Sequence, residues 1–385
     1  MITKAKTIYH RPDIILIALF GLILAFGLIV LTSASSAVGF DRFGDSYHFI
    51  KQQLVHGLLP GIIFLLIFSL VNYQKWKKFI FAFFIISLIL LISVFLPGIG
   101  AEYGGARSWI NLGPLSFQPS ELVKLTFLMY LSIWLAKRQD KDIKNWSSGL
   151  LPFLFITSLV CVLMALQPDT GTMIIILASS LIVFFASGAK LTHIATIGIG
   201  GAGLLLLMIK LSPYRTARLM TFLYPELDPQ GIGYHINQAF LAIGSGGLFG
   251  RGFGHSRQKF QYLPEVTGDS IYAIICEELG FLFAVMLIAL FILFFFKILK
   301  IANNCPDKFG RLLAIGIGSW FIVQAFVNIC AMIGLAPLTG VPLPFVSHGG
   351  TALAIGMAAF GILVNISRQT STLPQSNAVT SSWKK

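Results

Sequence analysis

The stretch LPEVTGDSIYAIICEELGF, from Leu263 to Phe281, opens a long apolar segment that we expect to be helical over 269–296. Aspartate at the centre of a membrane helix costs at least about 2.5 kcal/mol on insertion scales. The stretch nevertheless carries four acidic residues: Glu265, Asp269, Glu277 and Glu278. The stretch therefore predicts a membrane helix whose carboxylates have a functional role.

The composition of the whole chain is that of a membrane protein. Of its 385 residues, 56% are hydrophobic and 11% are charged, whereas charged residues make up about 25% of an ordinary soluble domain. Apolar segments of about 20 residues recur along the full length, and neither a separate soluble domain nor a cleavable signal pattern is visible. Because backbone polar groups in lipid must bond within one helix, we expect an all-α polytopic membrane protein.

We expect about ten transmembrane helices in a single membrane domain over residues 1–368. A long outer loop, 212–268, separates the seventh and eighth spans, and the Ser/Thr-rich segment 369–385 is expected to be a disordered cytoplasmic tail. The expected spans cover the following ranges: 14–34, 53–71, 79–97, 120–136, 149–166, 170–187, 191–210, 269–296, 312–335 and 347–366.

The charge pattern predicts which side of the membrane each loop occupies. The net charge is +13, and in a soluble protein such an excess would hint at nucleic acid. With the N-terminus in the cytoplasm, 18 of the 28 Lys and Arg residues fall on the cytoplasmic side and nine on the outer side. Five of those nine lie in the long loop, which translocates largely regardless of its charge. We therefore expect both termini in the cytoplasm and no nucleic-acid partner.

The loop 212–268 is too long for an ordinary connection, because loops beyond about 15 residues are usually functional or disordered. Its segment YHINQAFLAIG is expected to form a short interfacial helix. The outer arginines either bind an anionic headgroup such as pyrophosphate, which suits the forked guanidinium, or form a basic surface facing anionic lipid. These arginines are Arg107, Arg215, Arg218, Arg251 and Arg257.

Polar residues gather where spans four, six, eight and ten enter the membrane from outside. Each of these entries carries a polar or strained segment: SFQPSELVKL, QPDTGT, TGDSIYA and PLPFVSHGGTA. We expect one outward-facing polar cavity built from helix N-termini. Its members from the four entries are Gln118, Glu121, Lys124, Asp169, Asp269, Ser347 and His348.

Several of these residues also allow a purely structural interpretation. Glu121 and Lys124 are three residues apart and share a helix face, so they either form a buried pair that fixes helix packing or line a substrate cavity. Asp169 fits an interaction with a helix dipole. Asp269 in a first helical turn fits a cap, although an intramembrane carboxylate marks a functional site by default.

The remaining carboxylates are expected to support the structure. Glu277 lies about 12 Å deeper than Asp269, too far for the carboxylate pair of a retaining glycosidase, and Glu278 points nearly opposite. We expect both to bond to neighbouring helices. The histidines are dispersed and the four cysteines are scattered without metal-binding spacing, so the sequence shows no metal site.

Five long motifs, in order along the chain, resemble the SEDS family (shape, elongation, division and sporulation). They are GGARSWINLGPLSFQPSELVKL, LQPDTGT, YRTARLMTFLYPELDPQGIGYHINQAFLAIGSGGLFGRGFG, LPEVTGDSIYAIICEELGF and GVPLPFVSHGGTAL. The resemblance covers essentially the whole chain, and the pattern is closer to the division branch, FtsW, than to the elongation branch, RodA.

The resemblance implies a ten-span protein of the bacterial inner membrane, at the division septum, that polymerises lipid II into glycan strands. It implies as partners a class B penicillin-binding protein and other membrane proteins of the division machinery. The family's catalytic aspartate falls on Asp269. Its His-Thr-Asp-Phe motif reads TGDS here, with Thr267 in place of the histidine, and His348 stands where tyrosine is usual.

The resemblance also implies roles for the other candidates. The family's Arg-x-Trp and Glu-x-x-Lys elements fall on Arg107, Trp109, Glu121 and Lys124. With them we expect Gln118, Arg215, Arg218, Ser347 and His348 to bind substrate, and Asp169, Glu265 and Glu277 to support the site. No cofactor is firmly implied, although a divalent cation, Mg²⁺ or Mn²⁺, would help to neutralise a pyrophosphate.

The implied reaction is an inverting displacement in which Asp269 acts as the general base on a sugar hydroxyl. Two other functions stay open at this stage: a flippase that carries lipid II across the membrane, and a non-catalytic scaffold for division. A flippase needs a polar route open to both faces. The polar residues here gather on the outer side, which favours the enzyme.

Overall fold

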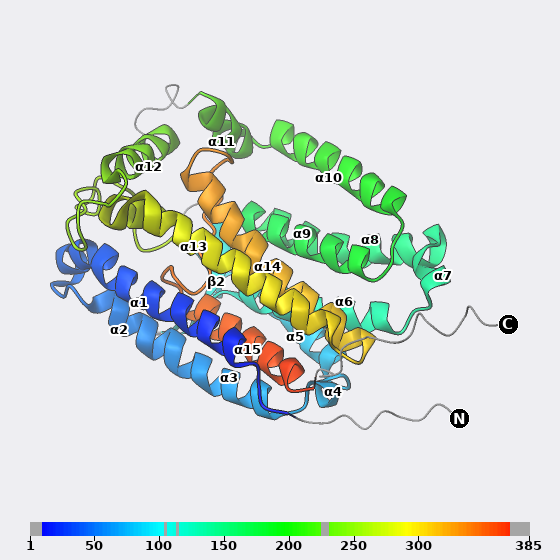
Figure 1. The fold of residues 1–385 in the computed structure, drawn as a ribbon. Helices are drawn as coiled ribbons and strands as arrows, with labels where there is room; N and C mark the ends of the chain where they lie inside the picture. The colour runs from blue at the N-terminus through cyan, green and yellow to red at the C-terminus, as the bar shows by residue number, and fades with distance from the viewer. Residues whose placement is uncertain (1–9, 104–105, 113–114, 225–230, 370–385) are drawn as a thin grey trace, which may run out of the picture.

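A computed structural model describes residues 10–103, 106–112, 115–224 and 231–369 of the chain. Helices dominate this part of the chain and run roughly alongside one another (Figure 1). In chain order they are α1 (Ile14–Phe43), α2 (His48–Gln52), the π-helical η1 (Gln53–Leu58), α3 (Leu59–Leu70), α4 (Tyr73–Trp76), α5 (Ile80–Ser93), α6 (Pro119–Ala136), α7 (Asp140–Ile143), the π-helical η2 (Trp146–Leu150), α8 (Leu151–Leu166), α9 (Thr170–Ala186), α10 (Leu191–Leu211), α11 (Pro213–Leu223), α12 (Ile232–Gly246), α13 (Ile271–Asn303), α14 (Lys308–Met332) and α15 (Gly350–Ser367).

Every expected span coincides with a helix. Seven helical stretches in the described part of the chain are long and apolar enough to cross a membrane, which makes this a multi-pass membrane protein. They are Ile14–Phe43, His48–Leu70, Trp146–Leu166, Leu191–Leu211, Ile271–Asn303, Lys308–Met332 and Gly350–Ser367. The apolar helices α5 and α9 are shorter, and α6 carries a buried ion pair.

The centre of the bundle is formed by α14 and α15. The apolar 18-residue stretches of these two helices are 78% and 89% buried by the rest of the protein. Helix α15 packs against α3, and α14 packs against α6, α9 and α13. Close approach depends on small residues: a Cβ added at Gly361 of α15 would lie 2.6 Å from the carbonyl oxygen of Leu65 in α3. By contrast, the corresponding apolar stretch of α10 is only 6% buried.

Helix α13 differs from the span expected over 269–296. It begins at Ile271, extends to Asn303, and is interrupted at Gly280, whose φ of 81° is left-handed. The loop before it supplies the hydrogen bonds that the break removes: Arg251 N–H donates to Glu277 O, and Phe281 N–H donates to Gly247 O, each over 2.9 Å. The backbone of the loop is therefore hydrogen-bonded to α13 at this break.

The described part of the long loop 212–268 contains two helices. The helix predicted at YHINQAFLAIG is confirmed as α12, and α11 is a further helix that the sequence reading missed. α11 packs between α10 and α12, and α12 packs against α13.

A small antiparallel sheet is a second feature that the sequence did not predict. It has the strand order β1 (Gly100–Tyr103), β2 (Ala106–Leu112) and β3 (Leu115–Phe117). In the register Ala101 pairs with Trp109, and Ile110 pairs with Phe117. The sheet leads directly into the N-terminus of α6.

The two ends of the described chain meet. His10 N–H donates to Arg368 O over 3.0 Å, so both ends lie on one face of the bundle. The tail expected over 369–385 lies outside the described residues except for Gln369. That residue is buried and bonded to Asn365 over 2.9 Å, so it belongs to the folded part.

Candidate functional site

A polar cavity of about 710 Å³ lies where the N-terminal ends of α6, α9, α13 and α15 converge. The sheet, α12 and the segments 264–269 and 338–342 complete its walls. The cavity predicted from the four polar entries is therefore present. Nine expected site residues line it: Trp109, Gln118, Glu121, Lys124, Asp169, Arg218, Glu265, Asp269 and His348.

Asp269 is the carboxylate with the most unusual surroundings. It lies two residues before α13, whose N-cap residue is Ser270 and not Asp269, so Asp269 does not occupy the cap position of that helix. Its Oδ1 is closed to solvent and has no hydrogen-bond partner. Burial, with a smaller contribution from the charge of Glu265, raises the pKa of Asp269 to about 7.

Three hydrogen bonds from separate elements hold the chain around Asp269. Asn328 of α14 donates from Nδ2 to the carbonyl oxygens of Asp269, over 2.7 Å, and of Val341, over 2.8 Å. His348 N–H donates to Thr267 O over 2.8 Å. His235 Nε2 and Ser270 Oγ share a bond of 2.6 Å. The carboxylate is therefore presented by a backbone that is fixed on both sides.

Burial and the neighbouring positive charge of Arg218 lower the pKa of His235 to about 4. Burial also lowers the pKa of His348 to about 4, helped by the charges of His48 and His56. Both imidazoles are accordingly neutral at pH 7, and each presents one donor and one acceptor. Neither His235 nor His348 therefore adds a positive charge that would bind an anion in the cavity.

Glu121 and Lys124 form the predicted pair. Lys124 Nζ lies 2.8 Å from Glu121 Oε1, and both side chains are almost completely buried. The ammonium also donates to Gln324 Oε1 over 2.8 Å and lies 5.0 Å from the centre of the Trp320 ring. The pair fixes α6 against α14, as the structural interpretation predicted, and both residues also line the polar cavity.

Asp169 caps α9, as the helix-dipole interpretation predicted. Its Oδ1 accepts from Thr172 N–H over 3.0 Å, while its Oδ2 is buried without a partner. Because the residue also lines the cavity, this second oxygen is an acceptor that the protein leaves unused.

Comparison with known proteins decides the family. The FtsW/RodA/SpoVE family model, described as "Cell cycle protein", matches residues 13–372. The chain belongs to this family. "Stage V sporulation protein E" of Bacillus subtilis is 38% identical over 366 residues, which cover 95% of this chain and 99% of that protein. "Probable peptidoglycan glycosyltransferase FtsW" of Trichlorobacter lovleyi is also 38% identical, over 92% of this chain and 93% of that protein.

Solved structures of FtsW/RodA/SpoVE relatives share the fold. One chain comes from the work "Structural coordination of polymerization and crosslinking by a peptidoglycan synthase complex". It superposes with a TM-score of 0.76 at 28% identity and covers 93% of this chain and 98% of its own length. RodA of Thermus thermophilus superposes with a TM-score of 0.69 at 26% identity and covers 93% of this chain and 97% of its own.

Four residues that were expected to belong to the site do not line the cavity. Arg107 is exposed on β2. Arg215 donates from Nη2 to Ala165 O over 2.9 Å, near the C-terminal end of α8, where a cation is favourable. Ser347 Oγ accepts from Leu343 N–H over 2.8 Å and so closes a turn. Glu277 does not line the cavity either.

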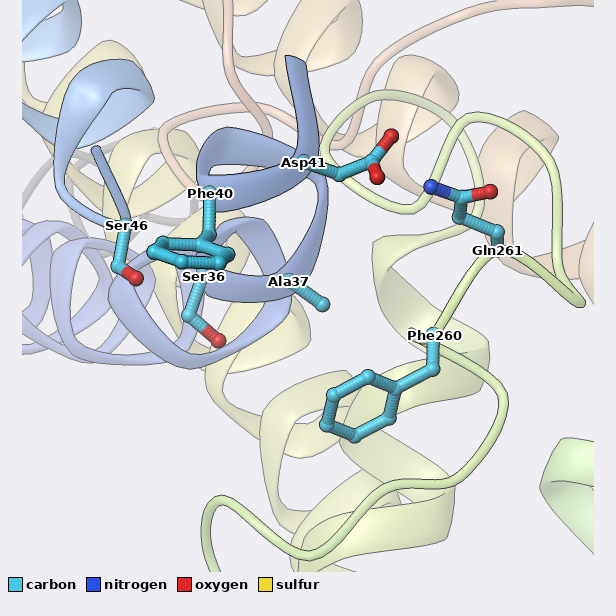
Figure 2. Close-up of a pocket in the computed structure, with 7 residues that line it drawn as sticks. All are labelled: Ser36, Ala37, Phe40, Asp41, Ser46, Phe260 and Gln261. Atoms are coloured by element: carbon cyan, nitrogen blue, oxygen red, sulfur yellow. The ribbon is translucent and has the colours of Figure 1, made fainter. Parts of the chain in front are cut away.

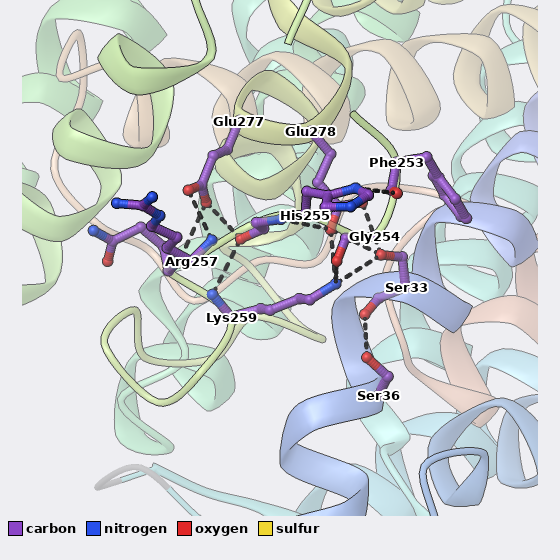
Figure 3. Close-up of polar contacts among 11 residues, drawn as sticks. Ser33, Ser36, Phe253, Gly254, His255, Arg257, Lys259, Glu277 and Glu278 are labelled. Carbon is purple, nitrogen blue, oxygen red and sulfur yellow. Dashed lines mark hydrogen bonds and ion pairs between the residues drawn. The ribbon is translucent and has the colours of Figure 1, made fainter. Parts of the chain in front are cut away.

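The expectation for Glu277 was wrong in its partner, whereas that for Glu278 was right in part. Glu277 accepts from Ser256 Oγ over 2.5 Å and from Arg257 N–H over 2.9 Å, both in the loop rather than in a helix. Glu278 accepts from Ser33 Oγ of α1 over 2.7 Å and pairs with Lys259 over 2.9 Å (Figure 3). The two carboxylates hold the outer loop to the bundle.

The sequence reading missed Asn328 and His235. Asn328 lies in an otherwise apolar span, and a lone amide there is a signal that could have been followed. His235 was visible only as part of the expected short helix. Its distance in sequence from Ser270 gave no sign that the two would bond.

The residues of the cavity can be compared with the ligands that a divalent cation requires. Among the described residues no three His, Cys, Asp or Glu side chains gather as metal ligands. However, Mg²⁺ is commonly bound by one or two carboxylates, water and the phosphates of a substrate. Glu265, which lines the cavity, fits that incomplete ligand set.

Proposed function

We propose that this protein is a peptidoglycan glycosyltransferase that polymerises lipid II into glycan strands at the outer face of the inner membrane. The single observation that carries the proposal is Asp269, a carboxylate in a polar cavity with an unpartnered oxygen and a pKa raised to about 7. The name "Probable peptidoglycan glycosyltransferase FtsW", borne by several relatives, supports it.

Asp269 acts as the general base. The acceptor's sugar hydroxyl attacks the anomeric carbon of the donor, and its proton passes to Asp269 while the bond to the pyrophosphate breaks. The pyrophosphate leaves as an anion, so no second carboxylate is needed as an acid. A base with a pKa near the working pH combines a large ionised fraction with sufficient basicity.

In this proposal Arg218 meets the leaving pyrophosphate, and its position in the cavity lining, which Arg215 does not share, supports that role. Its Nη1 also donates to Leu338 O over 3.2 Å. Its forked donors suit phosphate oxygens. Lys124 is already bonded to Glu121 and Gln324, so its role is to shape the wall. A bound Mg²⁺ or Mn²⁺, with Glu265 as its protein ligand, would add positive charge beside the pyrophosphate.

The partner in this proposal is a class B penicillin-binding protein, which crosslinks the strands. The structural relative described as part of a peptidoglycan synthase complex supports such a partnership. We place the protein at the division septum, with other membrane proteins of the division machinery. The equal identity to a sporulation protein makes spore cortex synthesis the second process to test.

The test compares Asp269→Asn with the unchanged protein, each purified with its penicillin-binding partner and given fluorescent lipid II. We expect the variant to reach the membrane at normal levels and to lose 10²–10⁴-fold in glycan synthesis, the usual contribution of a general base. Asp140→Asn, an exposed carboxylate far from the cavity, is the matched control. Polymerisation at the unchanged rate would exclude Asp269 as the base.

The same variant and the same lipid substrate distinguish the two rival functions. A flippase would move lipid II between the leaflets of liposomes without forming a glycan ladder. A scaffold would support division in cells carrying Asp269→Asn. Neither rival is favoured by a specific contact in the cavity.

A further inference from the structure

A second hollow, of about 380 Å³, lies between the end of α1 and the outer loop, and we call it the α1 pocket. Figure 2 shows Phe40 and Asp41 of α1 on one side and Phe260 and Gln261 of the loop on the other. Its remaining lining residues are Ser36, Ala37 and Ser46. None of these seven residues lines the polar cavity.

The lining combines groups that recognise a sugar. Phe40 and Phe260 are 66% and 60% exposed, so their rings are available to stack on the apolar face of a pyranose. The Asp41 carboxylate and the Gln261 amide point toward each other across the pocket (Figure 2). Neither side chain has a hydrogen-bond partner in the described part of the chain. The carboxylate and the amide can therefore bond to neighbouring hydroxyls, or to the acetamide group, of a sugar. The volume lies within the range of small-ligand sites.

The two walls of the α1 pocket are held together beneath it. Lys259, next to Phe260, reaches α1 and donates to Ser33 Oγ over 3.1 Å, while its ammonium pairs with Glu278 over 2.9 Å (Figure 3). Ser36, in the pocket, donates to Ser33 O over 2.8 Å. Lys259 and Glu278 are both almost fully buried, so the pocket exists before any ligand arrives.

One short segment joins the α1 pocket to the polar cavity. Gln261 lines the first hollow and Glu265 lines the second, four residues further on. Both have a left-handed backbone, with φ of 65° and 49°. Non-glycine residues in this region are uncommon and concentrate at active sites and ligand clamps.

We propose that the α1 pocket binds a sugar unit of the growing glycan while the strand end lies in the polar cavity. This inference rests on the proposed function, because it assumes that the product is a glycan. By holding the strand between additions, the pocket would favour long products over early release. The chemistry of each addition would be unaffected.

Binding is tested directly with chitotetraose, a soluble β-1,4-linked N-acetylglucosamine chain, by saturation-transfer NMR on the purified full-length protein. We expect saturation transfer from the unchanged protein and at least a fivefold loss in Phe260→Ala, Gln261→Ala and Asp41→Asn. Tyr262→Ala is the matched control, since this neighbour is 57% exposed and lines neither hollow. Absence of transfer from the unchanged protein, or equal transfer in all variants, would overturn the proposal.

Polymerisation gives a second readout. With lipid II we expect Phe260→Ala and Gln261→Ala to shorten the glycans at least twofold in mean length, with the initial rate within twofold of the unchanged protein. Unaltered length in both would also overturn the proposal. If the unchanged protein bound chitotetraose but made no glycan, the proposed function would fail while the sugar site stood. If no sugar bound, and quenchers carried by lipids quenched a fluorescent label at position 260, Phe40 and Phe260 would belong to the membrane interface instead.

Discussion

At the scale of single residues, the surroundings of Asp269 disfavour the ionised form of its carboxylate, which is the form that a general base needs. The protein buries the carboxylate and places Glu265 nearby, and both raise its pKa to about 7. An acid whose pKa is higher in the folded state than in the unfolded chain binds its proton more tightly when folded. Its ionisation therefore destabilises the fold as the pH rises from about 4 to above 7. The proposed base is present at a cost in stability.

This cost leads to a pH prediction. Glycan synthesis should rise as the pH increases through about 7, because only the ionised carboxylate accepts the proton. Over the same interval Asp269→Asn should gain thermal stability relative to the unchanged protein, with the two melting temperatures converging below pH 4. Melting curves between pH 3 and pH 9 and initial rates between pH 5 and pH 9 measure the two effects. A rate that does not change across this interval would contradict the assignment.

Asn328 carries a second prediction at this scale. Asn328→Leu keeps the approximate volume but leaves the carbonyl oxygens of Asp269 and Val341 without their donor. Each buried unpaired group costs about 1–3 kcal/mol, so we expect a lower melting temperature together with at least a tenfold loss of synthesis. Cys330→Ala, half-buried on the same helix, is the control. Full synthesis by Asn328→Leu would show that Asp269 needs no such support.

At the scale of elements, the helices were predictable because each is an apolar run long enough to span a membrane. The sheet between Gly100 and Phe117 was not, since its strands are short and lie in a segment with no strict alternation of polar and apolar residues. The convergence of α6, α9, α13 and α15 followed from their polar entries. The hydrogen bonds that fix Asp269 did not, because Asn328, His235 and His348 are far from it in sequence.

Helix α6 gives an element-scale prediction through its buried pair. Glu121→Gln and Lys124→Met should each lower the free energy of unfolding by about 3–5 kcal/mol, because each leaves one charge buried and unpaired. The double variant should cost less than the sum of the two. A double-mutant cycle measured by thermal unfolding tests this. Strict additivity would mean that the ion pair contributes no coupling energy, despite the 2.8 Å contact.

At the scale of the whole molecule, the bond between His10 and Arg368 places both described ends on one face. Combined with the charge bias, this face is expected to be cytoplasmic. The positions proposed as outer, around the polar cavity and the α1 pocket, lie at the opposite ends of the helices.

Cysteine labelling in intact cells measures this orientation. In a background whose four native cysteines are replaced by alanine, we expect a membrane-impermeant reagent to label His255→Cys and to leave Lys144→Cys unlabelled. Both positions are exposed, so access depends only on the side of the membrane. Permeabilised cells provide the control, in which both should react. The reverse pattern would invert the topology.

The burial of α15 has a consequence for biosynthesis. It lies between α3 and α14 at the centre of the bundle and is the last described helix to leave the ribosome. Until it is inserted, the face of α3 that packs against it lacks this partner, and the polar cavity lacks its lining residues Gly350 and Ala352. The core of the bundle is therefore complete only when the last described helix is in place. A ribosome that stalls before residue 350 leaves a chain without Gly350–Ser367, the span most deeply buried among the apolar spans of the described residues.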